Sequence, residues 1–422
     1  MTVDTIGLTI DELAGGGDGV GRFQDRAVFV PDTAPGDRVR VQVRERRRRW
    51  WRATLVEVME PGPGRQDPAC PMSLVCGGCS WHHVQYDHQL TAKGALLERA
   101  FRQARVDAPA AELIPAPDPL GYRCRARWHW RRRDDASLAL GLVGRRSHRL
   151  VDLTTCPVLL PHLSTLVPDL RGAFPTAGTG GELLVLGNTR GHSAVALHGV
   201  SDPTAAAALG EALAPALQGV TTRPRVDGRI GRASTWGSLE IDQGQADAPP
   251  FWTTPETFFQ ANPGVNQHLV DLVAARAAAT DGPCLELFAG SGNLTRGLAR
   301  RRKVTAVESD PEAATLARRN LRDLDVEWLT EDAGRALGHL SGRDLAGGLV
   351  VLDPPRTGAR DLLDDLAGLC PRRVIYVSCD PMTLARDVAH LARAGYLLGR
   401  LTVLDTMPQT HHFETVAELL LA

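Results

Sequence analysis

The sequence predicts a multidomain α/β protein with a small N-terminal β-barrel, a central α+β domain and a C-terminal Rossmann-like domain. A chain of 422 residues is too long for one ordinary domain, and 43% hydrophobic residues are enough to build packed cores. Short strand-like runs separated by turns dominate the start, whereas strands alternate with helices from about residue 265. We place the domains at residues 1–62, 63–255 and 256–422.

Short apolar or alternating runs predict the N-terminal barrel. Glycine and proline turn signals at Gly15–Gly17 and Pro35–Asp37 separate them. Strands this short and this regularly spaced favour a small closed barrel over an open sheet. A stretch rich in proline and glycine, Pro61–Pro71, then reads as a linker. The predicted strands are Thr5–Asp11, Arg26–Pro31, Arg38–Arg44 and Ala53–Glu60.

The central region opens with a predicted helix, His88–Ala104, because Leu90, Leu97, Phe101 and Ala104 recur on one helical face. Residues 121–250 mix short strands with helical pieces, and their pattern does not predict a topology.

The last third alternates strands and helices, which predicts a parallel sheet with helices on both faces and a ligand at the carboxyl ends of its strands. Two strand-like runs, Tyr396–Leu404 and Phe413–Leu421, follow at the end. The predicted parallel strands include Cys284–Phe288, Val304–Glu308, Leu349–Leu352 and Val374–Ser378.

Composition and the N-terminal residues indicate the cellular compartment of the protein. No apolar run approaches the roughly 18 residues of a membrane span. The first residues carry Asp4, Asp11 and Glu12 and lack the pattern of a signal peptide. We therefore expect a cytoplasmic protein without membrane attachment. We also expect a monomer, although nothing in these residues determines the oligomeric state. Its eight cysteines should be reduced, so that clustered cysteines indicate metal binding or catalysis.

The segment Leu285–Asn293 places a tight glycine turn directly after a predicted strand, so that the backbone can approach a ligand closely. The dinucleotide fingerprint needs a small residue where this chain has Thr295. Glu308 could accept hydrogen bonds from ribose hydroxyls, and Asp332 could meet an adenine amine. Acidic residues at both places favour S-adenosyl-L-methionine over a dinucleotide. The alternative is an unrelated α/β domain with a chance glycine turn.

Cys379 follows a predicted strand at the ligand edge and is our candidate nucleophile. A thiolate can add to C6 of a uracil ring, which turns C5 into a carbanion able to attack an electrophilic methyl group. The C5 proton must then leave, and Glu414 could remove it if the last strand runs beside that of Cys379. A buried structural cysteine is the alternative. The neighbouring Asp353 and Glu414 favour the nucleophile.

Three cysteines form a compact group, Cys70, Cys76 and Cys79, and Cys156 is the candidate for a fourth ligand. This spacing suits either zinc or an iron–sulfur cluster. The adjacent His82 and His83 would favour zinc, and the spacing alone leaves both open. The remaining cysteines, Cys124, Cys284 and Cys370, have no such partners.

Two basic stretches predict RNA contacts. Arg44–Arg52 holds six arginines beside Trp50 and Trp51, and residues 121–150 hold nine arginines. Arginine interleaved with aromatic residues suits phosphate contacts combined with base stacking. The alternative for each stretch is an ordinary solvated charged face. In residues 121–150 the aromatic residues expected to stack are Tyr122, Trp128 and Trp130.

Taken together, these segments resemble the TrmA/RumA-type RNA 5-methyluridine methyltransferases over nearly the whole chain. The barrel, with Gly15–Gly21 and Ala34–Asp37, resembles a TRAM domain, and the cysteine pattern resembles the iron–sulfur site of the family. Phe258–Asn262 matches the segment that precedes the Rossmann-like methyltransferase domain. Asp380 departs from the asparagine expected in many relatives.

The resemblance implies S-adenosyl-L-methionine and a [4Fe–4S] cluster as cofactors and RNA as partner. Cys379 would be the nucleophile and Glu414 the base. The expected RNA is 23S rRNA, with the tRNA T-loop as the alternative. A catalytically inactive RNA-binding iron–sulfur protein is a second alternative. The implied cluster ligands are Cys70, Cys76, Cys79 and Cys156. The residues expected to contact the donor or bridge to the base are Gln260, Phe288, Gly290, Asn293, Glu308, Asp332 and Asp353.

Overall fold

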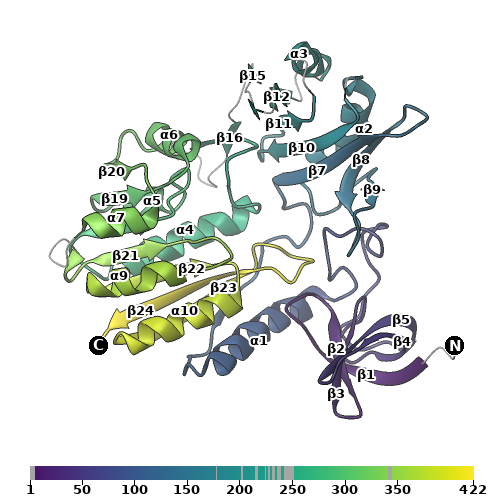
Figure 1. Ribbon diagram of the computed structural model, residues 1–422, viewed down its shortest axis with the longest axis horizontal. Coiled ribbons are helices and arrows are strands. Elements are labelled where there is room, and N and C mark those ends of the chain that lie inside the picture. Colours follow the sequence, from purple (N-terminus) through teal and green to yellow (C-terminus); the bar gives the residue numbers. More distant parts are fainter. Residues whose placement is uncertain are drawn as a thin grey trace.

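The computed structural model describes residues 5–422 apart from 177, 201–202, 214–216, 224, 227–228, 231–232, 235–238, 242–250 and 341–344. A barrel at the N-terminus, a central antiparallel sheet and a large C-terminal α/β unit follow one another along the chain (Figure 1). In this part of the chain, no helix is long and apolar enough to cross a membrane.

Five strands close the N-terminal barrel in the order β1-β2-β3-β5-β4, which confirms the predicted barrel. Asp37 is fully buried and ties the barrel to the following linker. Its carboxylate accepts hydrogen bonds from the backbone of Ala34 (2.6 Å) and Gly62 (2.8 Å) and pairs with Arg65. The strands are β1 (Thr5–Leu13), β2 (Gly19–Phe23), β3 (Arg26–Val30), β4 (Arg38–Arg46) and β5 (Trp50–Glu60).

The central sheet has the order β15-β12-β11-β10-β7-β8-β9, and helix α2 (Pro161–Ala173) packs on it. Neighbouring strands run antiparallel except β11 and β12. Alternate residues of β7 point inward and bury Trp128 and Trp130 in its core. Its strands are β7 (Arg125–Arg132), β8 (Leu138–Val143), β9 (Leu150–Asp152), β10 (Gly180–Gly187), β11 (Ser193–His198), β12 (Leu217–Arg223) and β15 (Ala233–Ser234).

Shorter elements complete the central region. Two small antiparallel pairs join β13 to β14 and β16 to β17. These elements are α3 (Pro203–Ala212), β13 (Arg225–Val226), β14 (Arg229–Ile230), β16 (Leu239–Ile241) and β17 (Phe251–Thr253).

The C-terminal sheet has eight strands in the order β20-β19-β18-β21-β22-β24-β23-β6. Strands β20 to β22 are parallel, and β24 then joins antiparallel, so the predicted Rossmann-like sheet is confirmed. These strands are apolar and mostly buried, as expected for a sheet covered by helices on both faces. They are β18 (Cys284–Leu287), β19 (Val304–Val307), β20 (Val326–Leu329), β21 (Leu349–Leu352), β22 (Arg373–Ser378), β23 (Tyr396–Leu404) and β24 (Glu414–Leu421).

The helices of the C-terminal unit begin at well-formed caps. Asp310 caps α6, Asp332 caps α7 and Asp380 caps α10, each by accepting hydrogen bonds from the first backbone amides. The helices are α4 (Pro263–Ala277), α5 (Thr295–Leu298), α6 (Pro311–Asn320), α7 (Ala333–His339), η1 (Arg360–Leu362), α9 (Leu363–Gly368) and α10 (Pro381–Arg393).

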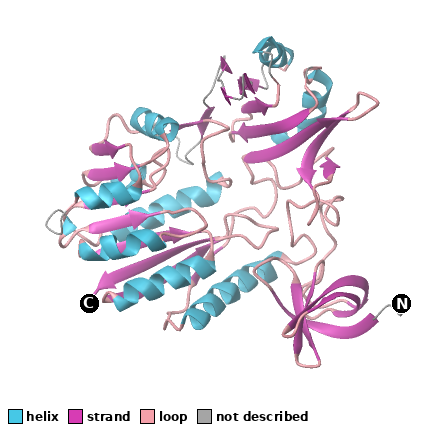
Figure 2. Cartoon of the chain, viewed as in Figure 1, coloured by secondary structure: helices cyan, strands magenta, loops and turns pink. Residues whose placement is uncertain are grey.

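One segment within the expected central domain belongs by packing to the C-terminal unit. Helix α1 (Tyr86–Ala104) packs against α10, and β6 (Glu112–Ile114) pairs with the outer side of β23. Figure 2 shows α1 beside the C-terminal helices. Leu97 and Phe101 of α1 enter the same apolar core as Leu391, which is the physical reason for this arrangement. The domain limits at 62 and 255 stay predictions.

Candidate active site

Several parallel strands of the C-terminal sheet end at one edge, and each is followed by a residue predicted for the site. Strand β18 ends before Phe288, β21 before Asp353 and β22 before Cys379. Since β18, β21 and β22 are consecutive parallel neighbours, these three residues leave the sheet side by side.

Cys379 and Glu414 lie across one strand pair. In the antiparallel ladder of β22 and β24, Ser378 stands opposite Thr415. Cys379 directly follows Ser378 and Glu414 directly precedes Thr415, and the charge of Glu414 acts on the Cys379 thiol, so the two side chains lie close together. The sequence-based condition, that the last strand runs beside the strand of Cys379, is therefore met. Cys379 is half-buried, whereas the side chain of Glu414 is buried.

The electrostatics of this edge disfavour negative charge. Burial, with the nearby Glu414 carboxylate, raises the pKa of the Cys379 thiol to about 11, and the Arg356 guanidinium opposes this rise. Burial raises the pKa of Asp353 to about 7. Burial and the charge of Asp353 also raise the pKa of Glu414 well above its usual range, against a hydrogen bond from Gln260 and the charge of Arg356. Thus one thiol and two carboxyl groups lie close together, and the ionisation of one group disfavours the ionisation of the others.

The glycine turn after β18 has the sharp backbone that the sequence predicts. Phe288, Gly290 and Gly292 all have positive φ angles, of 62°, 57° and 90°. The amide of Gly290 donates to Oε2 of Glu308 at 2.8 Å, so Glu308 supports the turn from the end of β19. A positive φ is unfavourable for phenylalanine and indicates a backbone held by its surroundings.

A pocket lies above this turn, and it brings together five of the residues predicted for the donor: Gln260, Phe288, Gly290, Asn293 and Asp353. Asn293 exchanges two side-chain hydrogen bonds with Asn266 of α4, at 2.9 and 2.8 Å, which fixes its orientation. Six further residues line the pocket without having been predicted: Phe258, Phe259, Glu286, Ala289, Ser291 and Leu294.

Glu308 and Asp332 do not line this pocket. Glu308 is half-buried and bonded to the turn. Asp332 is exposed and accepts a hydrogen bond from Gly334 at the start of α7. Their contacts with ribose and adenine stay predictions.

Glu286 is the clearest residue that sequence reasoning missed. It is 2% exposed, and its Oε2 has no hydrogen-bond partner among the described residues. Burial raises its pKa to about 8. A carboxylate in the middle of a buried apolar strand, between Leu285 and Leu287, was the available signal, because such a group is costly without a function or a partner.

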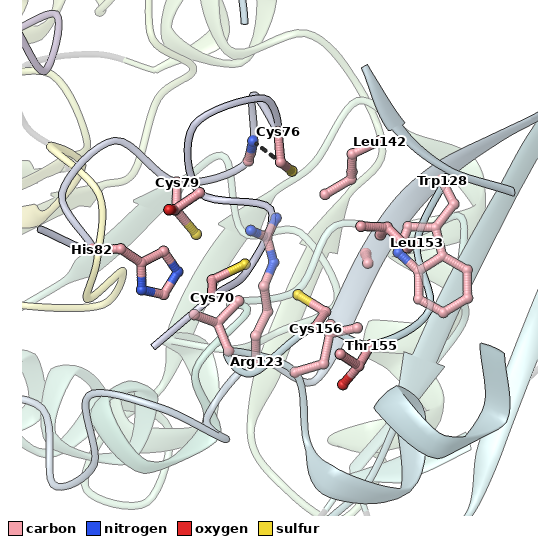
Figure 3. Close-up of a pocket in the computed structure, with 15 residues that line it drawn as sticks. Cys70, Cys76, Cys79, His82, Arg123, Trp128, Leu142, Leu153, Thr155 and Cys156 are labelled. Carbon is pink, nitrogen blue, oxygen red and sulfur yellow. Dashed lines mark hydrogen bonds between the residues drawn. The ribbon is translucent and has the colours of Figure 1, made fainter. Parts of the chain in front are cut away.

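The four predicted cluster ligands converge on a second pocket. Cys70, Cys76, Cys79 and Cys156 line one hollow. Their side chains approach from two separate segments, with Arg123 between them (Figure 3). Burial, together with the nearby Cys156, raises the pKa of Cys79 to about 12.

The histidines beside this hollow have different surroundings. His82 lines the hollow, and burial lowers its pKa to about 4. The ring of His83 contacts the carbonyl of Thr33 in the barrel at 3.1 Å. Among the described residues, no three or more His, Cys, Asp or Glu side chains are arranged to hold a single metal ion.

The two basic stretches differ in the structure. Between β4 and β5, Arg47, Arg48 and Arg49 are exposed, and Arg52 lies 5.4 Å from the Trp50 ring. In residues 121–150, the expectation that the aromatic residues stack on bases is wrong. Their alternate positions on and before β7 point inward, so all three are buried in the central core: Tyr122, Trp128 and Trp130.

Comparison with known proteins identifies the chain. Over 98% of its length it is 35% identical to an uncharacterized RNA methyltransferase of Thermosynechococcus vestitus. It is 33% identical to the 23S rRNA (uracil(1939)-C(5))-methyltransferase of Tolumonas auensis, over 99% of this chain and 96% of that one. The chain belongs to the RNA (uracil-C5)-methyltransferase family. The family profile described as tRNA (Uracil-5-)-methyltransferase matches residues 250–421, and the TRAM domain matches residues 1–56.

Solved structures agree on the fold of this methyltransferase. The tRNA (uracil-54, C5)-methyltransferase of Pyrococcus abyssi, solved with S-adenosyl-L-homocysteine, superposes with a TM-score of 0.75. It covers 98% of this chain and 100% of its own, at 24% identity. This likeness establishes the overall fold of the family member.

Proposed function

We propose that the chain transfers a methyl group from S-adenosyl-L-methionine to C5 of a uridine in RNA, with Cys379 as nucleophile and Glu414 as base. One observation carries the proposal: Cys379 and Glu414 lie next to the paired residues Ser378 and Thr415 of β22 and β24, close enough for Glu414 to act on the thiol. A nucleophile close to a base fits an addition followed by removal of a proton.

The pocket above the glycine turn fits the donor. It combines an apolar ring at Phe288 with amide and carboxyl groups at Asn293, Glu286 and Asp353. Bound S-adenosyl-L-methionine would supply an electrophilic methyl group and a positive charge. A positive charge beside Asp353 and Glu414 would stabilise their carboxylate forms and lower the pKa values that burial has raised.

The reaction then uses this chain's own residues in order. The Cys379 thiol loses its proton to water, its sulfur then forms a bond to C6 of the ring, and the electron pair of the C5–C6 double bond moves toward C5. C5 forms a bond to the methyl carbon while the bond from that carbon to the donor sulfur breaks, so that S-adenosyl-L-homocysteine would leave. Glu414 removes the C5 proton, and the electron pair that is released re-forms the C5–C6 double bond and expels the Cys379 thiolate. The raised pKa of Cys379 means that the thiol is protonated at neutral pH until substrate binding changes its surroundings.

The four-cysteine hollow fits a [4Fe–4S] cluster, which the resemblance implies, although its thiols would also suit zinc. Four thiol groups from two segments line it, and soft thiolates are ligands of both. The choice of an iron–sulfur cluster over zinc rests on the resemblance of the cysteine pattern to the iron–sulfur site of the family. Cys70, Cys76, Cys79 and Cys156 would hold the cluster, which would join the two segments as a structural crosslink.

The expected RNA is 23S rRNA, since relatives that share nearly the whole chain carry that substrate in their names. The tRNA T-loop is the alternative, as in the name of the Pyrococcus enzyme. The exposed arginines between β4 and β5 supply phosphate contacts for either. We infer a cytoplasmic monomer acting on RNA.

The deciding experiment incubates the purified protein with donor labelled in its methyl group and with separated rRNA and tRNA. The expected result is label in 5-methyluridine at one position of 23S rRNA, located by mass spectrometry of nuclease fragments. Label in tRNA alone would replace rRNA by the T-loop. RNA binding without any transfer of label would favour the inactive RNA-binding protein.

A further inference from the structure

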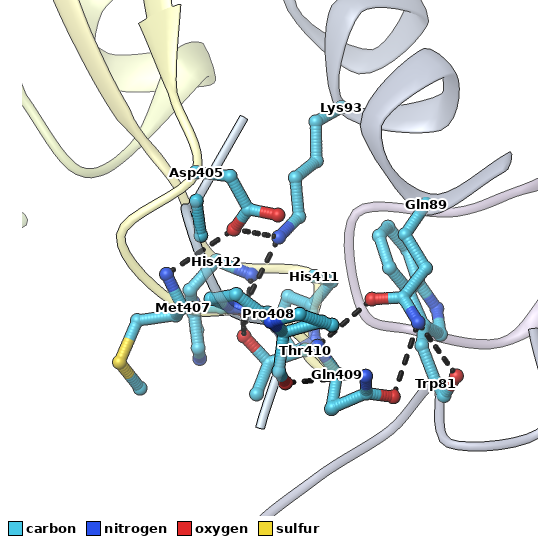
Figure 4. Close-up of polar contacts among 12 residues, drawn as sticks. Trp81, Gln89, Lys93, Asp405, Met407, Pro408, Gln409, Thr410, His411 and His412 are labelled. Carbon is cyan, nitrogen blue, oxygen red and sulfur yellow. Dashed lines mark hydrogen bonds and ion pairs between the residues drawn. The ribbon is translucent and has the colours of Figure 1, made fainter. Parts of the chain in front are cut away.

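The loop between β23 and β24, residues 405–413, ends directly before Glu414 and is held by polar contacts from other parts of the chain (Figure 4). Glu414 is the first residue of β24, where it pairs with Leu404, the last residue of β23. A change in the path of this loop therefore moves the carboxylate that lies close to Cys379.

A buried ion pair fixes the first turn of the loop. Nζ of Lys93, on α1, lies 2.6 Å from Oδ1 of Asp405, and both side chains are completely buried. The same ammonium donates to the carbonyl of Met407 at 3.1 Å, and the amide of Met407 donates to Oδ1 of Asp405 at 3.2 Å. Thus one lysine holds a side chain and a backbone carbonyl of the same turn.

A second pair, between glutamines, fixes the middle of the loop. The amide of Gln409 donates to Oε1 of Gln89 at 2.8 Å, and Nε2 of Gln89 donates to Oε1 of Gln409 at 3.1 Å. Gln409 has a φ of 66°, a conformation that needs such support. The carbonyl of Gln409 accepts hydrogen bonds from the backbone amides of Ser80 and Trp81, the two residues that follow Cys79.

The end of the loop reaches the active site. His412 lies 3.4 Å from Nη2 of Arg356, the guanidinium that acts on Cys379. The ring of His411 contacts the hydroxyl of Ser80 at 3.2 Å. The loop is therefore anchored on α1 at one end and lies against the catalytic groups at the other.

Burying an ion pair often gains no stability over apolar residues of similar volume, and in some proteins such a pair serves instead to select one conformation. We propose that Lys93 and Asp405 are positioning residues, which hold Glu414 and Arg356 in the arrangement with Cys379 that removal of the C5 proton requires. This inference rests on the proposed function and assigns it two residues that touch neither substrate nor donor.

The test compares the full-length wild type with Lys93→Met and with the double variant Lys93→Met/Asp405→Asn, in which no lone charge stays buried. Lys303→Met is the matched control, since Lys303 is the only other lysine and forms an exposed pair with Glu327. The substrate is a 23S rRNA transcript with tritium at C5 of uridine, so that tritium release reports loss of the proton. Rates are divided by the number of sites that bind S-adenosyl-L-homocysteine in calorimetry.

Both Lys93 variants should release tritium roughly 100-fold more slowly per binding site, because a catalytic group misplaced by on the order of 1 Å slows a reaction by about that factor. A covalent protein–RNA adduct that survives denaturant should accumulate, and Lys303→Met should behave as wild type. Lys93→Arg, which keeps the charge, should recover part of the rate.

Wild-type tritium release per binding site in the double variant, or a loss explained by fewer binding sites alone, would overturn the positioning role. A wild-type protein that releases no tritium from any RNA would instead contradict the proposed function. The experiment therefore distinguishes a failure of the positioning role from a failure of the proposed function.

Discussion

Cys379 and the four-cysteine hollow show how differently one residue type is used in this molecule. Burial raises the pKa of thiols in both places, to about 11 at Cys379 and about 12 at Cys79. The neighbours differ: carboxyl groups and Arg356 surround Cys379, whereas Cys79 faces other thiols. A single thiol beside a base suits transient bonding to a substrate, whereas converging thiols suit a lasting bond to a metal centre.

The largest effect that separates the two regions is expected for Cys379→Ala. Methyl transfer should fall by a factor on the order of 10⁶, because a covalent nucleophile is lost. Binding of S-adenosyl-L-homocysteine, measured by calorimetry, should be unchanged, since no donor-pocket residue is altered. Substantial residual transfer would show that Cys379 is not the nucleophile.

Glu414→Gln should slow turnover by about 10²- to 10⁴-fold, the usual contribution of a general base. The variant should still form the bond to C6 and accept the methyl group, so a covalent protein–RNA adduct should accumulate on denaturing gels. Normal turnover would contradict the role of Glu414. Thr415→Val, at the next position of β24, is the control.

Cys156→Ser should affect the four-cysteine hollow. We expect loss of visible absorbance in anaerobically purified protein and a lower melting temperature, because a thiolate ligand is replaced by a poor one. Transfer per folded molecule should fall far less than in Cys379→Ala. Colourless wild-type protein containing zinc would exclude the iron–sulfur cluster. Cys370→Ser, at an exposed cysteine, is the control.

The smallest expected effect is a change in the pKa of the Cys379 thiol. Glu414 raises the pKa of Cys379, so Glu414→Gln should lower that pKa from about 11. Alkylation by iodoacetamide at pH 8 should then become faster, by about tenfold for each unit of change, because the thiolate reacts. The pH dependence of alkylation at the exposed Cys370 should stay the same. An unchanged profile for Cys379 would mean that Glu414 is not close to the thiol in solution.

The sequence predicted the parts of the fold that depend on local pattern. Turns at Gly15–Gly17 and Pro35–Asp37 indicated the barrel, and the alternation after residue 265 indicated the C-terminal sheet. The closeness of Cys379 and Glu414 was predicted only on the condition that the last strand runs beside the strand of Cys379, because strand pairing is non-local. Trp128 and Trp130 were misread because basic residues alternate with them on β7, and a two-residue period does not say which face is buried.

Other parts of the site gave no usable local signal. The attachment of α1 and β6 to the C-terminal sheet depends on contacts between residues about 300 apart, such as Lys93 and Asp405. A lone lysine in a helix reads as a surface residue, and only its partner reveals that it is buried. Glu286 did carry a signal, because its strand is otherwise apolar.

The short strand β6 has a consequence for dissecting this enzyme. It pairs with Thr402–Leu404 at the end of β23, which would otherwise be the edge strand of the sheet. A fragment that starts at residue 256 lacks this cover and also the helix that packs against α10. Exposed edge strands recruit other chains, so such a fragment is expected to self-associate more than one that begins at residue 86 and keeps β6 and α1.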